Sequence, residues 1–349
     1  MPKEENATSD IKNILVIGAS AGGTSAISQL LSGLSPSMDI AVLVVLHVSR
    51  KSNPNIIGAT FQKKTLLKCK VAQDGWPLQR GYAYIAPPEH QLMVKRNKLC
   101  LTQGTHENKY RPSIDVLFRS AAVNFGHRTI GVILTGLLED GTSGMWAIKQ
   151  CGGICIVQDP EEAQFSDMPR SVINKIKVDY IGTLEVIPDI IKLLSKKNLP
   201  EKIPVPHELR AEADITEKMM SDIIELRKIA DHSDFTCPDC GGQLWKIKND
   251  PTNRYRCHTG HVYGERLLAE LQSKNIEESV WVAIRMLEEK QNLMLLMAKR
   301  NSDQEEPEAP SYHYKRIQDI ELHIKHLKSL LMLLLPDMRR SDEELGYTL

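Results

Sequence analysis

Continuous apolar runs alternate with amphipathic segments over roughly the first 196 residues of the chain. Three aliphatic runs lie at Ile14–Ile17, Ile40–Leu46 and Ile130–Leu134. Such runs are typical of parallel strands that are covered on both faces. Apolar residues recur at helical spacing in the segments Thr24–Leu34, Ser113–Asn124 and Thr142–Gln150. This alternation predicts an α/β domain over residues 12–196, with a doubly wound, mostly parallel, Rossmann-like sheet.

Within this domain the stretch Lys70–Leu101 has a different pattern. Its short β-prone pieces, separated by Pro87-Pro88 and by Lys95–Lys98, predict a strand followed by an antiparallel hairpin. Further strands are expected at Gly153–Gln158 and Val178–Leu184, and a closing helix at Pro188–Lys196.

The remaining third of the chain predicts three smaller parts. Residues 197–232 are expected to form a proline-containing linker with one helix, Ile215–Ile229. A cysteine-containing module follows at 233–265, and a helical hairpin at 275–336. The hairpin consists of Asn275–Ala298 and Tyr312–Leu335, joined by the acidic segment Asp303–Pro310. An apolar stripe in its second helix favours an antiparallel hairpin over a coiled-coil dimer, because the stripe is under three heptads long.

Composition excludes several classes of function. The 349 residues contain 44 Lys and Arg against 44 Asp and Glu, so there is no basic excess to attract nucleic acid. The N-terminus lacks the apolar core of a signal peptide, and no run is long enough for a membrane span. Seven cysteines, three of them clustered, indicate a metal site in a reducing compartment, so a cytoplasmic location is expected.

Chemistry is suggested first by the turn after the first strand. Gly18 and Gly22 flank Ser20 in a G-x-S-x-G pattern, which suits a sharp turn that exposes the hydroxyl beside a helix N-terminus. A phosphate-binding or packing turn remains the alternative. A dinucleotide fingerprint fits less well, because it requires glycine where Ser20 stands.

Two further polar residues follow buried strands. His47 ends the second strand, and Asp140 follows the strand Ile130–Leu134. Taken singly, they are better explained as a solvated strand-end histidine and a helix N-cap. Together with Ser20 they predict a Ser-His-Asp hydrolase site, with Ser20 as nucleophile, His47 as base and Asp140 as the orienting acid. Their order in the chain disfavours the α/β-hydrolases.

The sequence closely resembles the catalytic domain of the chemotaxis protein-glutamate methylesterases, the CheB family, over about residues 12–195. The resemblance is carried by Ile17–Gly23, His47, Tyr84–Pro87, Arg111–Phe118, Leu134–Gly136, Asp140-Gly141, Gly144-Met145, Gln158-Asp159, Phe165 and Met168-Pro169. It implies hydrolysis of a glutamate methyl ester on a methyl-accepting chemoreceptor, with glutamine deamidation in some relatives. It implies the same roles for Ser20, His47 and Asp140, and no catalytic cofactor.

Three departures from the family pattern concern this site. Ala21 replaces a small hydroxyl residue, and Leu137-Leu138-Glu139 replaces Met-Gly-Asn. The backbone N–H groups of Ala21 and Leu137 are the expected oxyanion donors, while Leu138 in place of glycine is expected to alter the loop. The third departure is that only about a dozen residues precede the first strand, so a phosphorylated receiver domain in cis is not expected.

The cysteine module predicts a structural zinc site. Cys237 and Cys240 form a C-x2-C knuckle, and Cys257 with His261 would complete a tetrahedron in a zinc ribbon. His261 is favoured over His258, because adjacent residues such as Cys257 and His258 rarely bind one ion. Unmetallated cysteines are the alternative.

The expected function is therefore that of a serine methylesterase with a zinc-ribbon and hairpin appendage that docks or regulates. The alternatives are an esterase or amidase of the same fold in a non-flagellar signalling pathway, and a weakly active scaffold that binds a partner through the appendage. The oligomeric state is left open.

Overall fold

The computed structural model describes residues 11–197, 202–219, 223–302 and 309–345. Most of the polar N-terminus, part of the predicted linker and most of the acidic connection after residue 302 lie outside the described residues. The chain divides into two compact units, Met1–Glu265 and Arg266–Leu349.

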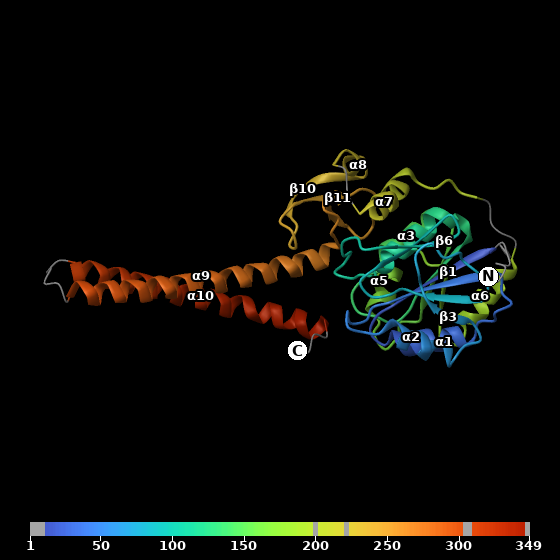
Figure 1. Cartoon of the computed structure of the whole chain (residues 1–349), viewed down its shortest axis with the longest axis horizontal. Coiled ribbons are helices and arrows are strands. Elements are labelled where there is room, and N and C mark those ends of the chain that lie inside the picture. Colours follow the sequence, from blue (N-terminus) through green and yellow to red (C-terminus); the bar gives the residue numbers. More distant parts are fainter. Residues whose placement is uncertain (1–10, 198–201, 220–222, 303–308, 346–349) are drawn as a thin grey trace, which may run out of the picture. The chain divides into compact units, whose positions relative to one another are not determined.

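A seven-stranded parallel sheet forms the centre of the first unit (Figure 1). Its strands, in spatial order, are β3 (Lys68–Val71), β4 (Tyr82–Ile85), β2 (Ile40–Leu46), β1 (Asn13–Ala19), β7 (Thr129–Ile133), β8 (Ile154–Gln158) and β9 (Tyr180–Gly182). The predicted doubly wound sheet is therefore confirmed. Because β1 is central and the chain proceeds from it first to β2 and later to β7, the carboxyl end of β1 lies where α/β sheets bind ligands.

Helices cover both faces of this sheet. On one face pack α1 (Gly23–Ser32), α2 (Pro54–Gln62) and α6 (Ile187–Lys196). On the other pack α3 (Ile114–Phe125), α4 (Thr142–Gln150), α5 (Asp167–Lys175) and the antiparallel hairpin of β5 (Gln91–Lys95) and β6 (Lys98–Thr102). The hairpin was predicted from the sequence, whereas the short elements α2, α5 and β3 were not.

The segment after α6 corrects a prediction. In place of one helix from Ile215 to Ile229, the structure has α7 (His207–Lys218) and α8 (Ile223–Ile229). The backbone of Met219 turns into the left-handed region with φ of 57° and ends α7. Helix α7 packs on α3 through Leu209 and Ala213, which join the core of the sheet domain. The predicted linker is thus partly a layer of the domain.

A small antiparallel sheet follows, made of β10 (Ala230–Thr236), β11 (Gln243–Ile247), β12 (Tyr255–Cys257) and β13 (Val262–Tyr263). We call residues 230–264 the ribbon. It begins a few residues before the predicted boundary at 233.

Buried ion pairs join the ribbon and α7 to the large sheet domain. Arg119 of α3 donates to Glu107 at 2.8 Å, Arg254 of the ribbon donates to Glu212 of α7 at 2.8 Å, and Arg256 of β12 donates to Glu107 at 3.2 Å. Asp250 accepts from Arg254 at 2.8 Å. All six side chains are at most 3% exposed. We call this set the buried charge network. Three cations face three carboxylates, so the charges balance.

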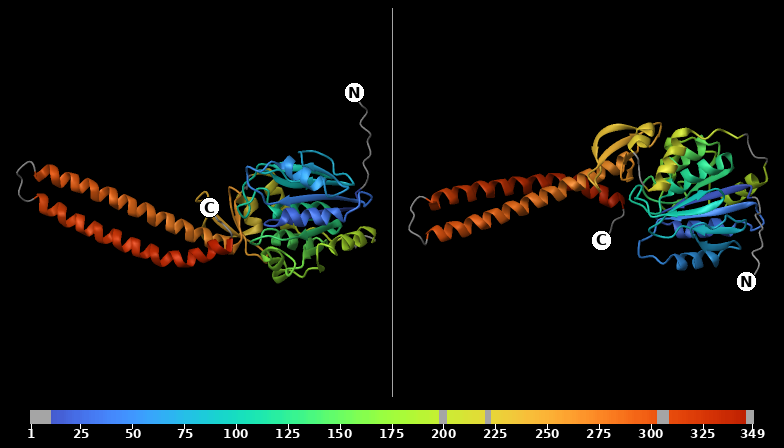
Figure 2. Two further views of the ribbon diagram at one scale, coloured as in Figure 1. Left: turned by 90° about the horizontal axis from the view of Figure 1, so that it is seen from below. Right: turned by 45° about the horizontal axis from the view of Figure 1, so that its top comes forward.

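The second unit is a pair of long helices, α9 (Glu265–Ser302) and α10 (Ala309–Leu345), which lie side by side (Figure 2). Their contact is formed by Ile284, Ile320, Ile324 and Leu331, with Val280, Leu287, Met294 and Leu327 around them. This confirms the predicted hairpin, although both helices extend beyond the predicted ends. The apolar stripe expected in the second helix consists of Ile317, Ile320, Ile324, Leu327, Leu331 and Leu334, and the side chain of Leu334 lies outside the described residues.

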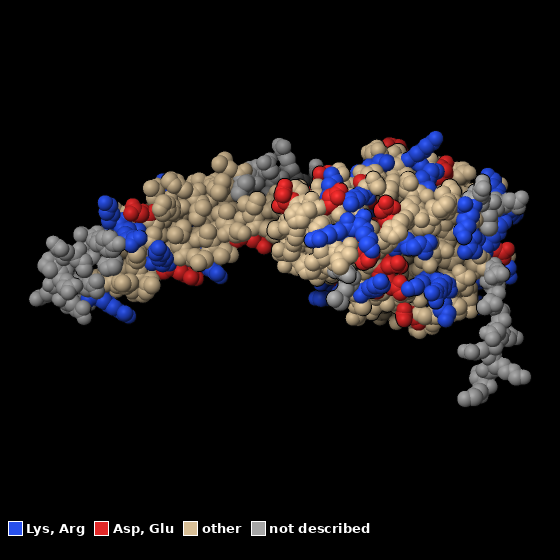
Figure 3. Space-filling view, turned by 90° about the horizontal axis from the view of Figure 1, so that it is seen from above, with Lys and Arg blue, Asp and Glu red and all other residues tan. Residues whose placement is uncertain are grey.

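The surface agrees with the balanced composition. On the face shown in Figure 3, basic and acidic side chains are interspersed over the first unit. Among the described helices, none is both long and apolar enough to cross a bilayer.

Candidate active site

The turn that carries Ser20 is shaped by two glycines with different roles. A Cβ on Gly18 would lie 2.4 Å from the side chain of Ile114, so glycine is needed there for the close approach of α3 to β1. Gly22 caps α1 with φ of 74°, a conformation that favours glycine. The Ser20 N–H donates to the Thr135 carbonyl at 3.0 Å, which ties the turn to the end of β7. The G-x-S-x-G pattern therefore forms the predicted sharp turn.

Strand register places Ser20 and His47 next to each other. Ala19 of β1 is paired with Leu46 of β2, and the His47 N–H donates to the Ala19 carbonyl at 3.1 Å. The residues that follow these partners, Ser20 and His47, therefore leave adjacent strands at the same level.

The predicted contact between His47 and Asp140 is present. Nε2 of His47 lies 2.9 Å from Oδ2 of Asp140, and the two side chains are 4% and 0% exposed. The imidazole and the carboxylate thus meet at the carboxyl edge of the sheet, and the strand register places Ser20 on the strand between them.

Asp140 also occupies the N-terminus of helix α3. Its Oδ2 accepts from the Ile114 N–H at 2.7 Å, and its Oδ1 accepts from the Ser113 hydroxyl at 2.9 Å. Ser113 is the N-cap residue of α3, but its side chain makes no capping bond to the helix. The free backbone N–H groups and the helix dipole instead stabilise the negative charge of Asp140.

The environment of Asp140 favours its ionised form. Burial alone would raise the pKa of this carboxyl, but the hydrogen bond and charge of His47, then the Ile114 N–H and Asn108, give a net lowering. The neighbouring Asp115 has the opposite shift, because burial and the charge of Asp140 raise its pKa well above the usual value. Two adjacent carboxyls with pKa values moved apart leave one of them, Asp140, as the anion.

An aromatic ring covers the imidazole. Tyr110 stacks on His47 with ring centroids 3.5 Å apart and planes 8° from parallel. Among the described residues, Nδ1 of His47 has no hydrogen-bond partner although it is buried. Because Nε2 faces the ionised Asp140 and carries the ring proton, Nδ1 is the nitrogen left to accept a proton.

The expected oxyanion donors lie in the two loops that flank Ser20. In the described part of the chain, the backbone N–H groups of Ala21 and Leu137 donate to no protein acceptor. Leu138 has φ of 65°, so this leucine adopts the left-handed backbone that glycine would favour. A leucine held in this conformation carries backbone strain in the loop that follows β7.

Asn108 was not singled out by the sequence, nor was Tyr110. Nδ2 of Asn108 donates to Oδ1 of Asp140 at 3.2 Å and to Oδ2 of Asp115 at 3.1 Å. Both residues lie in the loop 105–111, which has no regular periodicity. Only its proximity to the Arg111–Phe118 motif could have drawn attention to it.

A second cluster lies in the ribbon, where Cys237, Cys240, Cys257 and His261 present ligand atoms that are all within 4.8 Å of one another. Cys240 Sγ is 3.8 Å from Cys257 Sγ, and His261 Nδ1 is 3.6 Å from Cys257 Sγ. Tetrahedral zinc with Zn–S bonds of about 2.3 Å requires S···S separations of roughly 3.8 Å. The four residues fit one zinc ion, and they include His261, whereas His258 is exposed and outside the cluster.

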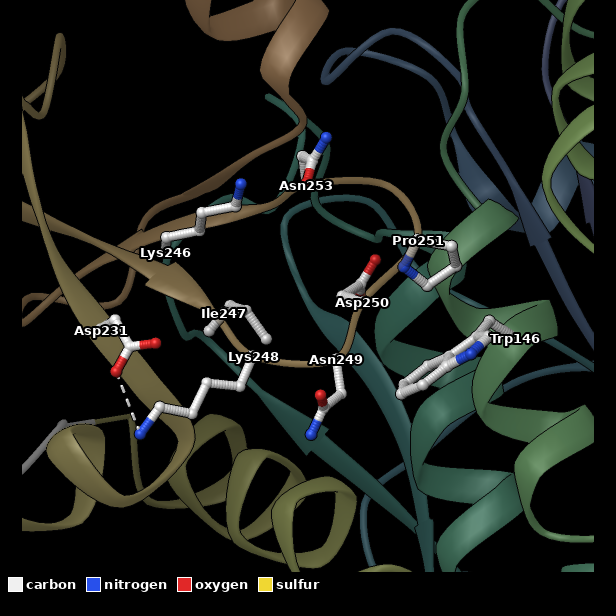
Figure 4. Close-up of a pocket in the computed structure, with 9 residues that line it drawn as sticks. All are labelled: Trp146, Asp231, Lys246, Ile247, Lys248, Asn249, Asp250, Pro251 and Asn253. Carbon is white, nitrogen blue, oxygen red and sulfur yellow. Dashed lines mark ion pairs between the residues drawn. The ribbon is translucent and has the colours of Figure 1, made fainter.

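A cavity of about 600 Å³ lies between α4 and the ribbon (Figure 4). Trp146 lines one side, and the ribbon residues 246–251 line the other. Asp231 and Lys248 form an ion pair of 3.1 Å at its edge. Its lining includes none of Ser20, His47 or Asp140, so the cavity is separate from the candidate active site.

Comparisons with known proteins agree with this site. The sequence model of the CheB methylesterase family matches residues 15–191. A protein of Leptospira interrogans named "Putative protein-glutamate methylesterase/protein-glutamine glutaminase" is 36% identical over 189 residues, which are 54% of this chain and 97% of that protein. The crystal structure of the Thermotoga maritima CheB methylesterase catalytic domain is 31% identical with a TM-score of 0.50, covering 52% of this chain and 98% of that domain.

A longer relative shows the limit of the match. The protein-glutamate methylesterase/protein-glutamine glutaminase 1 of Geobacter metallireducens is 32% identical over 196 residues, which are 52% of its own length. The family match ends at residue 191, so the ribbon and the helical hairpin lie beyond it.

Proposed function

Because this chain belongs to the CheB methylesterase family, we propose that it hydrolyses glutamate methyl esters of a signalling protein through Ser20, His47 and Asp140. The observation that carries the assignment is the 2.9 Å contact between His47 and an Asp140 held at the N-terminus of α3, one strand away from Ser20. The enzyme class is that of a carboxylic ester hydrolase.

The geometry supports a definite direction of proton transfer. The Ser20 hydroxyl attacks the ester carbonyl and gives its proton to Nδ1 of His47, because Nε2 already donates to Asp140. Asp140 stabilises the imidazolium, and the backbone N–H groups of Ala21 and Leu137 receive the charge on the carbonyl oxygen. The proton on Nδ1 then leaves with methanol. Water cleaves the acyl-enzyme by the reverse sequence and releases glutamate.

The same steps would deamidate glutamine, with ammonia as the leaving group. The names of the relatives in Leptospira and Geobacter include glutaminase as well as methylesterase, which supports this second activity. The proposed partner is a methyl-accepting chemoreceptor or a similar receptor, in the cytoplasm. All seven cysteines are free thiols in the structure, which fits a reducing compartment.

We also propose that the cysteine cluster binds a zinc ion with a structural role. Three thiolates and one imidazole form a closed four-ligand set that leaves no position for a reacting water, so the ion would hold the ribbon together and take no part in hydrolysis. The fold supplies further support, since the Tyr263 hydroxyl lies 3.2 Å from Cys237 Sγ and donates to Asp239 at 2.8 Å.

Methanol release from methylated chemoreceptor cytoplasmic fragments tests the function. The full chain is expected to release methanol, and Ser20→Ala is expected to abolish the release. A serine-reactive phosphonate gives an independent measurement, because it labels an activated Ser20 without any receptor. Labelling without methanol release would indicate another ester substrate. Absence of both would favour the scaffold alternative.

A further inference from the structure

We propose that the ribbon holds the catalytic side chains in place, a role that we call the brace. Asn108 is the positioning residue through which the ribbon orients Asp140 and His47. The inference rests on the proposed roles of Ser20, His47 and Asp140. It concerns what holds these groups in place, and it assigns that task to a part of the chain beyond the family match.

A continuous series of hydrogen bonds connects the ribbon to the imidazole. The Gly264 N–H, directly after β13, donates to Oδ1 of Asn108 at 3.1 Å. Nδ2 of Asn108 donates to Oδ1 of Asp140 at 3.2 Å, and Asp140 accepts from His47 at 2.9 Å. The ribbon backbone is therefore two hydrogen bonds away from the carboxylate that orients the base.

The contact with Gly264 fixes which way the Asn108 amide points. With Oδ1 occupied by a backbone donor, Nδ2 faces the carboxyl groups of Asp115 and Asp140. The flipped amide would place its oxygen against the Asp140 carboxylate and would leave Asp140 without this donor. Because Asn108 is buried, water cannot replace the missing bonds.

Strand pairing extends the same contact along the loop 105–111. The Asn108 N–H donates to the Val262 carbonyl at 2.8 Å, and Glu107 and Val262 form a parallel bridge. Two residues further on, Tyr110 stacks on His47. The edge of β13 thus supports the residues that contact both Asp140 and His47.

The cysteine cluster is joined to the same strand. Tyr263 of β13 contacts Cys237 through its hydroxyl, and the His261 carbonyl accepts from the Cys257 N–H at 3.0 Å. Val262 and Gly264, the two residues that hold Asn108, flank Tyr263 in the chain. Loosening the cluster would therefore loosen the strand that contacts the loop.

Two anchors keep the ribbon in place on the sheet domain. One is the buried charge network, in which Glu107 of the loop accepts from Arg256 of β12. The other is the Ser143 hydroxyl of α4, which donates at 2.7 Å to Asp250, a member of that network. Asp250 also lines the cavity between α4 and the ribbon (Figure 4).

The test is a double-mutant cycle in the full chain, measured by the rate constant of Ser20 phosphonylation. Asn108→Leu removes the amide, and His261→Ala loosens the cluster whether or not an ion is bound. Each single change is expected to slow labelling about tenfold, because misplacing a base has effects of that order. The double variant is expected to be no slower than either single variant, since both act through one contact.

Two control variants distinguish a specific loss of active-site support from general destabilisation of the fold. His258→Ala changes the other, exposed ribbon histidine, and Asn124→Leu makes the same amide-to-leucine change at the far end of α3. Both are expected to label like the parent protein. Amide hydrogen exchange is expected to rise in residues 105–111 of His261→Ala while the strands β1 and β7 stay protected.

The outcomes distinguish this inference from the proposed function. Rates that multiply in the double variant would overturn the brace, as would parental labelling in Asn108→Leu. Parental labelling in His261→Ala, despite faster exchange at 105–111, would also overturn it. If Ser20 of the parent protein is not labelled at all, the proposed catalytic site fails instead.

Discussion

Oδ2 of Asp140 accepts both from Nε2 of His47, at 2.9 Å, and from the backbone N–H of Ile114, at 2.7 Å. One oxygen therefore orients the proposed base and caps the helix that packs against the nucleophile strand. The orientation of the imidazole and the position of α3 depend on the same carboxylate.

Asp140→Asn tests this dual role. The amide has a single acceptor oxygen and no charge to balance an imidazolium, so phosphonylation of Ser20 and methanol release should fall on the order of 10³- to 10⁴-fold. The loss of the helix cap should also lower the free energy of unfolding by about 1 kcal/mol. Ser113→Ala is the control, because it removes one hydrogen bond and keeps the charge. Equal rates for these two variants would contradict the assignment.

Gly18→Ala tests the close approach of β1 and α3. The new Cβ would lie 2.4 Å from the side chain of Ile114, so we expect a loss of about 1–3 kcal/mol in the free energy of unfolding. Displacement of Ile114 should also slow Ser20 labelling. Gly182→Ala is the matched control, since its Cβ would find no atom nearer than 3.5 Å. Similar thermal unfolding of both variants would argue against the close contact.

Tyr110 provides a prediction for the stacked ring. Tyr110→Ala uncovers an imidazole that is now 4% exposed, and should slow Ser20 labelling roughly three- to tenfold, given the usual energy of ring stacking. Tyr110→Phe keeps the ring and should retain most of the rate. If the two variants label equally slowly, stacking is not the cause.

Glu212 predicts a dependence of stability on pH. Burial alone would raise the pKa of this carboxyl, but the charges of Arg119 and Arg254 lower it from 4.5 to about 2. A pKa that is lower in the folded state gives stability above about pH 4.5, and this stability is lost as the pH falls toward 2. The lowered pKa of Glu212 contributes on the order of 3 kcal/mol to the free energy of unfolding at neutral pH.

Urea unfolding of the full chain at pH 6 and pH 3 measures this effect. At pH 6, Glu212→Gln should be less stable than the parent by about 3–5 kcal/mol, because three buried arginines then face only two carboxylates and one positive charge is left unbalanced. The difference should shrink at pH 3, where protonation weakens the parent. A difference that stays constant between the two pH values would contradict the lowered pKa.

Metal analysis tests the cysteine cluster. The purified protein should contain about one zinc per chain, since four ligands complete a tetrahedral site. Cys237→Ser should lower the zinc content and the melting temperature, whereas Cys100→Ser, which removes a half-buried thiol outside the cluster, should leave the zinc content unchanged. A protein without bound metal would refute the zinc proposal.

The sequence predicted the contact of His47 with Asp140 because its cause is local. A polar residue after a buried parallel strand must emerge at the carboxyl edge of the sheet, and three such strands are neighbours here. The four cysteine-cluster residues were predictable for a similar reason, since the knuckle spacing is a short-range pattern.

The support of the site could not be predicted in this way. Asn108 and Gly264 are 156 residues apart, and no periodicity relates a loop to the end of a ribbon strand. Arg254 and Glu212 resemble ordinary surface charges in the sequence, because only the tertiary structure shows that they are buried opposite each other. Helix α7, which begins directly after Pro206 and packs on the domain, was likewise not predicted from the sequence.

The buried charge network also sets a rule for building chimaeras. Glu107 and Arg119 belong to the segment that matches the family, while Glu212, Asp250, Arg254 and Arg256 come after it. A ribbon grafted together with α7 onto another member of the family would bring two arginines and two acids, and their charges would balance only on a domain that carries counterparts of Glu107 and Arg119. A functional transplant would need all six residues together, so the two halves of this protein are expected to be exchangeable only as a matched pair.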